Sequence, residues 1–178
     1  MVKVKKIITD RLILDPLTID DIEAIYELAK DKKSIEDFQY VANSVEDVKA
    51  WLEPSLNDQS VFTWAIREND VLVGMIEAEQ GAEYSDITTN ICRIGYFIDH
   101  KRQNKGFGSE AIQAVIDWLF NNTEINRIEA GVTLHNIPSY RVLEKVGFIR
   151  DKIVKSNWKW YDQVYDSAYY YLLKPEPN

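Results

Sequence analysis

A glycine-containing junction in the second half of the chain is the feature that most constrains its fold. Residues 90–99 (NICRIGYFID) have the pattern of a strand, and residues 106–122 carry apolar side chains at helical spacing. A strand that leads directly into a helix presents consecutive backbone N–H groups at the helix start, where the helix dipole adds positive potential. The residues at this junction are Gln103-Asn104-Lys105-Gly106-Phe107-Gly108-Ser109.

This junction has the properties of a binding site for a bulky anion such as a pyrophosphate. Gly106 and Gly108 let the backbone approach the anion without obstruction by a side chain, and Lys105 supplies a further positive charge. The stretch is not a Walker P-loop, because no Gly-Lys-Ser/Thr follows, and it lacks the third glycine of a dinucleotide-binding fingerprint. Taken alone, two glycines that open a helix are also ordinary turn geometry.

The rest of the sequence predicts a single α/β domain over residues 1–178. No repeat, low-complexity tract or linker divides the chain. Residues 32–43 and 81–89 carry no pattern from which a structure or an acceptor site can be predicted. Strands are expected over residues 11–15, 61–67, 71–79, 127–134, 153–161 and 164–173, and helices over residues 18–30, 44–54 and 136–146.

Composition and charge argue against several classes of protein. The formal charge of −8 disfavours a general nucleic-acid binder, and it fits either a cationic partner such as an amine or simple solubility. The single cysteine, Cys92, cannot form an internal disulfide. We find no signal peptide and no membrane-spanning stretch, so we expect a cytoplasmic protein. His100 and His135 are too few for a zinc site, so we expect no metal.

Two segments carry a resemblance to a known family. The junction matches the Gln/Arg-x-x-Gly-x-Gly/Ala motif with which GNAT-superfamily N-acetyltransferases hold the pyrophosphate of acetyl-CoA. Ser109-Glu110-Ala111 resembles the Thr-Glu-Ala of the ribosomal-protein-type (RimJ/RimL) branch. Residues 136–148 (NIPSYRVLEKVGF) resemble the second motif of that branch, Asn-x-x-Ser followed by Val-Leu-Glu-Lys-x-Gly-Phe. Residues 11–14 and 166–173 are also similar, so the resemblance covers nearly the whole chain.

The resemblance implies a fold and a coenzyme site. The implied GNAT fold has a mostly antiparallel central sheet, splayed in the middle and flanked by about four helices. The pyrophosphate of acetyl-CoA would bind the junction, and the pantetheine arm would lie along a splayed strand like an added strand. Asn136 would orient this arm, although it is also a good helix N-cap. The expected coenzyme-binding residues are Phe97, Ile98, Gln103, Asn104, Lys105, Gly106, Phe107, Gly108, Ser109 and Asn136.

The reaction of this family is direct attack of an amine on a thioester. It needs a base for the amine and a proton for the departing thiolate. Many relatives supply that proton from a tyrosine, but Leu143 stands at the matching position here. The motif indicates Ser139 as the replacement, although a serine in a first helical turn also serves as a cap. Glu77 is the expected base, because with Glu79 it alternates on one strand face, where apolar neighbours raise a carboxyl pKa; two solvated carboxylates are the alternative.

Three functions fit these residues. The first is N-acetylation of a small amine, such as a polyamine, amino acid or drug-like molecule; the second is acetylation of a protein N-terminus. The third is a non-catalytic acyl-CoA-binding or regulatory module, which the absence of the tyrosine would fit. Trp158 stands near a place where ribosomal-type enzymes are expected to carry a glutamate, which weighs against the second. The aromatic C-terminal hairpin fits core packing with a homodimer contact, or one wall of an acceptor pocket.

Overall fold

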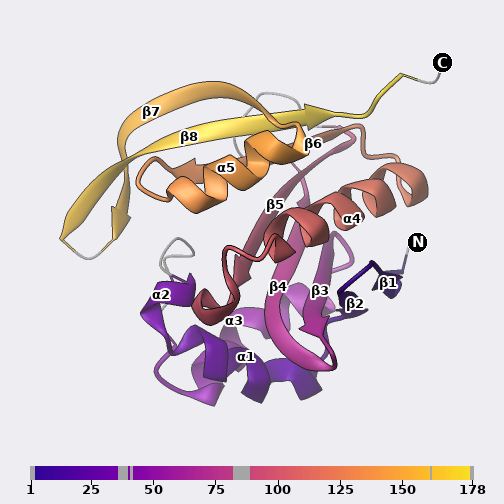
Figure 1. The fold of residues 1–178 in the computed structure, drawn as a ribbon, viewed down its shortest axis with the longest axis vertical. Helices are drawn as coiled ribbons and strands as arrows, with labels where there is room; N and C mark the ends of the chain where they lie inside the picture. The colour runs from indigo at the N-terminus through magenta and orange to yellow at the C-terminus, as the bar shows by residue number, and fades with distance from the viewer. Residues whose placement is uncertain (1–2, 36–39, 41, 82–88, 161, 177–178) are drawn as a thin grey trace.

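The computed structural model describes residues 3–35, 40, 42–81, 89–160 and 162–176. Its centre is an eight-stranded sheet in the order β1-β2-β3-β4-β5-β6-β8-β7 (Figure 1). The strands are β1 (Ile7–Ile8), β2 (Ile13–Pro16), β3 (Val61–Glu68), β4 (Val71–Gln80), β5 (Ile91–Ile98), β6 (Arg127–Thr133), β7 (Ile149–Trp160) and β8 (Gln163–Leu173). The helices are α1 (Ile22–Ala29), the one-turn α2 (Lys32–Ile35), α3 (Val45–Asn57), α4 (Phe107–Asn122) and α5 (Ile137–Val146), with 3₁₀ turns at Ile19–Asp21 and His100–Arg102.

The sheet opens in its middle, between β5 and β6. All neighbouring strands are antiparallel except these two, which run parallel because the crossover helix α4 joins them. β4 and β5 pair over seven positions, but β5 and β6 pair over only three and then separate. Those three pairs are Ile91↔Arg127, Cys92↔Ile128 and Arg93↔Glu129. The mostly antiparallel, splayed sheet that the resemblance implies is therefore confirmed.

The two faces of the sheet carry separate hydrophobic clusters. On one face, which we call the α4 face, α4 and α5 pack on side chains that include Ile76 and Ile98. On the other, the α3 face, α1 and α3 pack on side chains that include Met75 and Phe97. Residues that are consecutive in β4 and β5 thus point to opposite faces, as strand geometry requires. Figure 1 shows α4 and α5 close together against the sheet and α1, α2 and α3 gathered at the other end.

Two helices differ in extent from the sequence-based expectation. The helix expected over residues 18–30 is divided into a 3₁₀ turn and α1, and the Asp21 carboxylate accepts a hydrogen bond from the Thr18 N–H at 3.0 Å. α3 was expected to stop near Pro54, and this was wrong, because it continues to Asn57. A proline deprives the carbonyl four residues earlier of its N–H partner. That carbonyl belongs to Ala50, which is exposed, so water can satisfy it.

The C-terminal hairpin is longer than the sequence pattern indicated. β7 begins at Ile149, which pairs with Tyr171, rather than at residue 153. The alternation of apolar and polar residues did not indicate that the strand begins at Ile149. The reason is that β7 pairs with β8 with register shifts after Arg150 and after Val154, which interrupt a regular alternation. Tyr161, expected at the end of the strand, lies outside the described residues, as does most of the 81–89 segment. Part of the 32–43 segment, for which no structure was expected, forms α2.

Candidate active site

The junction after β5 is a tight loop that ends on the first turn of α4. Asn104 and Gly106 have φ angles of +61° and +82°, in the left-handed region, and Gly106 is the N-cap of α4. The Gln103 side chain donates from Nε2 to the carbonyl oxygen of Ile98 at 3.1 Å, which ties the loop to the end of β5. The first N–H groups of a helix have no partner within it, and at such a loop they are suited to bind phosphate groups.

Arg11, in the turn between β1 and β2, contacts this loop from the N-terminal strands. Its Nη1 donates to the carbonyl oxygen of Lys105 at 2.7 Å, and its Nε donates to Oε2 of Glu110 at 2.7 Å. Thr9 donates to the other oxygen of Glu110 at 2.6 Å. Burial acts to raise the pKa of Glu110, but the hydrogen bonds from Thr9 and Arg11 outweigh it and lower that pKa. Arg11 and Glu110 belong to two separate segments that resemble the family, and in the structure they contact each other and support the loop.

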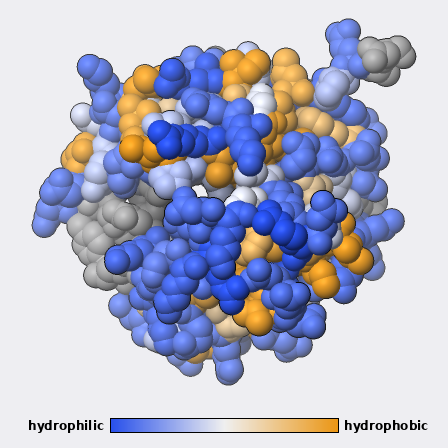
Figure 2. Space-filling view, viewed as in Figure 1, coloured by the Kyte–Doolittle hydropathy of each residue, from blue (hydrophilic) through white to orange (hydrophobic). Residues whose placement is uncertain are grey.

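A cavity of about 520 Å³ lies beside this loop, where β5 and β6 separate. Figure 2 shows a hollow near the middle of this mostly hydrophilic face. Ser139 lines the cavity, Lys105 lines an adjoining hollow with Arg11, and Glu77 is not part of the lining. The other expected coenzyme-binding residues all line it; they are Phe97, Ile98, Gln103, Asn104, Gly106, Phe107, Gly108, Ser109 and Asn136.

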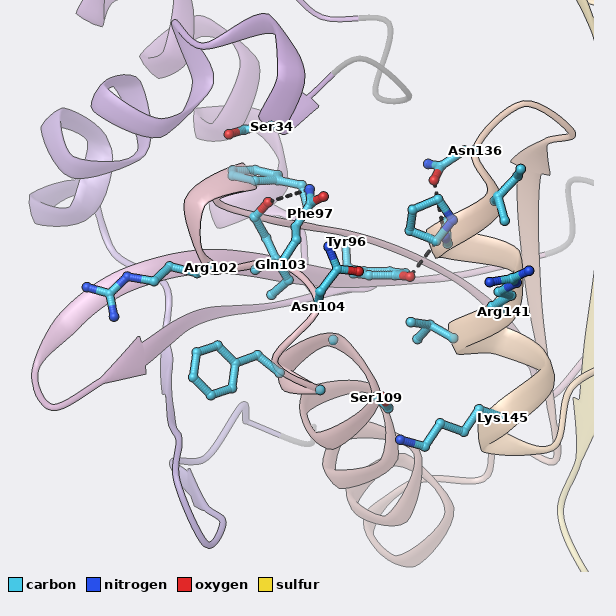
Figure 3. A pocket seen from close by; sticks show the side chains of 18 of the residues that line it. Ser34, Tyr96, Phe97, Arg102, Gln103, Asn104, Ser109, Asn136, Arg141 and Lys145 are labelled. Carbon is cyan, nitrogen blue, oxygen red and sulfur yellow. Dashed lines mark hydrogen bonds between the residues drawn. The ribbon is translucent and has the colours of Figure 1, made fainter.

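Positive side chains border the cavity although the chain as a whole is acidic. Arg141 and Lys145 of α5 and Lys33 of α2 belong to its lining. Figure 3 shows Lys145 extending toward Ser109 at the start of α4. In the described part of the chain, no acidic side chain forms an ion pair with Arg141 or Lys145. Their charge therefore adds to the positive potential of the α4 N-terminus, and a ligand with several phosphate groups fits this side of the cavity.

α5 places Ser139 in the cavity wall on the α4 face. Asn136 is the N-cap of α5, and its Oδ1 accepts a hydrogen bond from the backbone N–H of Ser139 at 3.0 Å. The hydroxyl of Ser139 has a different partner, because its Oγ lies 3.1 Å from the hydroxyl of Tyr96 on β5 (Figure 3). Leu143, at the position of the family tyrosine, is 1% exposed within the hydrophobic cluster. α5 therefore presents a serine hydroxyl to the cavity, and Asn136 rather than Ser139 caps the helix.

Glu77 lies on the α3 face of β4, on the opposite side of the sheet from α5. Its neighbour across the β4–β5 ladder is Gly95, so no β5 side chain stands next to it at that register. Burial raises the pKa of Glu77, a hydrogen bond from Ser55 of α3 opposes this, and the charge of Glu79 adds to the increase. Glu79 has a different environment, since Arg93 donates to it at 3.0 Å. The two carboxylates therefore differ in their contacts, since Glu77 faces Ser55 of α3 and Glu79 is paired with Arg93.

Cys92 and the groups that could bind a metal ion do not form a second site in the part of the chain that the structure describes. The thiol of Cys92 is buried, and burial together with the charge of Glu129 raises its pKa to about 12, so almost no thiolate exists at neutral pH. Within the described ranges, no group of three or more His, Cys, Asp or Glu side chains could hold a metal ion. None of the helices seen in those ranges has the length and apolar character needed to cross a membrane.

Sequence reasoning missed several residues of the cavity lining, among them Tyr96, Lys33 and Ser34. Tyr96 alternates with Ile94 and Ile98 on an apolar strand face, so its pattern predicts only core packing. Lys33 and Ser34 belong to the segment without a recognisable pattern, yet α2 brings both to the cavity. No signal within a short stretch of sequence could have found these residues, because each reaches the site only through contacts between distant segments.

A sheet opened between two parallel strands, with a loop at the opening that is suited to phosphate groups, is the arrangement that the resemblance to acyl-CoA-dependent N-acyltransferases implies. The sequence model of the acetyltransferase (GNAT) domain matches residues 11–149, and this chain belongs to that family. It is therefore an acetyl-CoA-dependent N-acetyltransferase. An uncharacterized N-acetyltransferase of Bacillus subtilis, YnaD, is 31% identical over 97% of this chain and 99% of its own length.

Two further relatives differ in the acceptors that their names state. The ribosomal protein uS5-alanine N-acetyltransferase of Escherichia coli is 34% identical over 41% of this chain and 40% of its own length, in line with the ribosomal-protein-type resemblance. The solved structure of spermidine N-acetyltransferase from Vibrio cholerae, in complex with CoA and spermine, has a TM-score of 0.80. At 17% identity, over 93% of this chain and 96% of that one, it shows the shared fold alone.

Arg11→Ala is expected to raise the KM for acetyl-CoA about fivefold and to leave kcat within about twofold. The lost hydrogen bond to the Lys105 carbonyl corresponds to roughly 1 kcal/mol, and Arg11 is not among the residues that line the main cavity. Steady-state kinetics at varied acetyl-CoA measure this. Arg11→Lys distinguishes the effect of the hydrogen bonds from that of the positive charge, because lysine keeps the charge but lacks the planar guanidinium group that donates to Lys105 and Glu110. An unchanged KM in Arg11→Ala would show that the loop does not need this contact.

Proposed function

We propose that this protein acetylates a primary amine of a small molecule by direct attack of the amine on the thioester of acetyl-CoA. The observation that carries the proposal is the opening between β5 and β6, which has the partly buried carboxylate of Glu77 on one side of the sheet and the Ser139 hydroxyl on the other. An amine would reach a thioester in this gap from the α3 face. The departing thiolate would meet a proton donor on the α4 face, so the two proton transfers use different groups.

The donor side of the proposal rests on the lining of the cavity. The backbone N–H groups over residues 103–109 would bind the pyrophosphate, supported by Lys105, Arg141 and Lys145. Among the described residues, the pairing of β5 with β6 covers only Ile91, Cys92 and Arg93, and the edge of β5 beyond them would hydrogen-bond the pantetheine arm. A strand N–H at this edge would also stabilise the oxyanion that forms when the amine adds to the carbonyl.

Glu77 would act as the general base. An aliphatic amine is protonated at neutral pH and must lose a proton before it can attack. A carboxylate whose pKa is raised accepts that proton more readily than an ordinary glutamate, and burial is the main cause of the increase at Glu77. The Ser55 hydroxyl contacts the same carboxyl group and would hold it in one orientation.

The surroundings of Glu77 favour a small cationic acceptor. Trp51 lies one helical turn before Ser55 on the same side of α3, and its ring stacks on Tyr40 with centroids 4.4 Å apart. Aromatic faces next to a carboxylate attract ammonium groups. The formal charge of −8 acts in the same direction over longer distances.

A protein N-terminus is the second candidate acceptor. The Asn-x-x-Ser motif at Asn136 and Ser139 and the uS5-alanine acetyltransferase relative favour it. The two acceptors share the chemistry of a primary amine and differ in size and charge.

The experiment is an acceptor panel with measured release of free CoA thiol and mass spectrometry of the products. The panel contains polyamines, amino acids, drug-like amines and short peptides with free or blocked N-termini. We expect turnover of a small amine, with kcat/KM at least tenfold above that of any peptide. Turnover of peptides alone would assign the second candidate. Binding of acetyl-CoA without turnover of any acceptor would instead assign a non-catalytic module.

A further inference from the structure

Ser139 is by itself a weak proton donor for a thiolate. A thiol has an ordinary pKa near 8.5, whereas an aliphatic hydroxyl such as that of serine holds its proton far more tightly. If Ser139 gave its proton to sulfur without replacement, the product would be an alkoxide inside the cavity, with no cation hydrogen-bonded to it in the described contacts. The hydroxyl can serve as a donor only if a second acid replaces its proton in the same step.

The side chain of Tyr96 is in position to be that second acid. Its hydroxyl lies 3.1 Å from Oγ of Ser139, and both residues line the cavity. The ring lies over the first turn of α4, since a Cβ added at Gly108 would be 3.4 Å from Cε2 of Tyr96. Figure 3 shows Tyr96 between the loop that ends at α4 and helix α5. The ordinary pKa of a tyrosine, about 10, is close to that of a thiol, so the transfer is energetically feasible.

We propose that Tyr96 is the terminal proton donor of the reaction and acts through the Ser139 hydroxyl. The inference rests on the proposed acetyl transfer. As the C–S bond breaks, its electron pair goes to sulfur, sulfur takes the Ser139 proton, and Oγ of Ser139 takes the Tyr96 proton. Tyr96 regains a proton from water, while the proton that the amine gave to Glu77 returns to water. The hydroxyl that α5 lacks at Leu143 is thus supplied by a strand on the opposite wall of the cavity.

Other hydroxyl groups near α5 are less suited to this role. Tyr170 is 1% exposed, and its hydroxyl donates to Glu144 at 3.1 Å, away from the cavity lining. Tyr140 packs against the hydrophobic cluster and does not line the cavity. His135 does line it and stacks on Tyr165 with centroids 4.2 Å apart. His135 is therefore the competing donor that the experiment must separate from Tyr96.

The test compares kcat and KM of wild type, Tyr96→Phe, Ser139→Ala and the double variant with the best acceptor found. Each single variant should lose about 10²-fold in kcat, the scale of one general acid, with KM for acetyl-CoA within about twofold. The double variant should lose no more than either single one, because the two hydroxyls act as a unit. Ser139→Thr should recover most of the activity. Tyr140→Phe, which removes the neighbouring phenol of α5, is the matched control and should retain wild-type kcat.

The pH dependence gives a readout that a purely structural role would not produce. In the wild type, kcat should fall at high pH as the donor loses its proton, and this limb should disappear in Tyr96→Phe. Site-specific incorporation of difluorotyrosine at position 96 should move the limb to lower pH, because fluorine makes the phenol more acidic. This measurement also decides the question if Tyr96→Phe fails to fold, which a missing melting transition would reveal.

Three results would overturn the inference. They are a wild-type kcat in folded Tyr96→Phe, losses that add in the double variant, or removal of the high-pH limb by His135→Gln instead. If the wild type transfers acetyl groups and Tyr96→Phe has the same kcat, the inference about Tyr96 is rejected and the proposed function stands. A wild type that acetylates no amine rejects the proposed function, and this inference with it.

Discussion

Glu77→Gln is expected to lower kcat/KM for acetyl transfer by about 10²–10⁴-fold, the range for loss of a general base. Glutamine has nearly the same shape and can keep the contact with Ser55, but it cannot accept the proton of the amine. The wild-type rate should rise with pH as Glu77 ionises, with a midpoint above 4.5, because burial raises the pKa of this carboxyl group. Kinetics at varied pH with one acceptor measure both effects.

The matched control is Glu79→Gln, which removes an equal charge two residues away on the same strand face. Its carboxylate is paired with Arg93, so activity should stay within several-fold of wild type. If Glu79→Gln caused the larger loss, the base would have to be reassigned.

Thermal melts give an independent check on Glu77. Between pH 4.5 and the raised pKa, the folded state holds a proton that the unfolded state has released, so ionisation of Glu77 lowers stability as pH rises. Glu77→Gln should therefore melt at a higher temperature than wild type at neutral pH, and this difference should shrink below pH 4.5. A melting temperature of Glu77→Gln below that of wild type at neutral pH would contradict a raised pKa of Glu77 in the folded state.

The second large effect concerns the loop at the start of α4. Excess acetyl-CoA, at about 100 times its Kd, should raise the melting temperature of the wild type by roughly 5–10 °C, which corresponds to about 2.7 kcal/mol. The double variant Gly106→Asp/Gly108→Asp should lose this rise. Gly106 has φ +82°, and a Cβ there would lie 3.3 Å from Nη2 of Arg11, so aspartate distorts the loop as well as repelling the pyrophosphate.

Gly81→Asp is the control for strain and charge in that experiment. Gly81 has φ +116°, and no described atom outside its two chain neighbours lies within 4 Å of an added Cβ. It follows the end of β4 that is far from the loop. This variant should be less stable than wild type and yet keep the full rise with acetyl-CoA. No rise in folded wild type, or a rise that survives in the double variant, would exclude the loop as the pyrophosphate site.

Much of the fold could be predicted because its signals are local. The alternation in β3, β4 and β5, the helical spacing in α4 and the cap at Asn136 each depend on residues within a few positions of one another. In α3, the preference of proline to end a helix conflicts with packing in the core, and the packing determines where the helix ends. α3 continues through Pro54, because Leu52 and Val48 anchor the helix in the core and the carbonyl that loses its partner faces solvent.

The candidate site likewise contains residues that local sequence signals indicate and residues that only tertiary contacts bring together. The loop over residues 103–109 could be located from its glycines and from the strand and helix on either side. The contact between Tyr96 and Ser139 spans 43 residues of sequence, and nothing near either position indicates it. The support that Arg11 gives to Lys105 spans 94 residues. Sequence reasoning selected Glu77 as the base, but it gave no difference between its surroundings and those of Glu79. The contacts with Ser55 and Arg93 supply that difference.

The sequence by itself thus determined the family, the order of most of the elements and the position of the loop at the start of α4. These follow from periodicity, glycine placement and motifs, which act over a few residues. Only the tertiary structure decided that Glu77 and Ser139 lie on opposite sides of an opening in the sheet, and that a tyrosine from β5 meets the serine of α5. The physical reason is that both depend on strand register and on helix–sheet packing, which bring together residues that no local pattern connects.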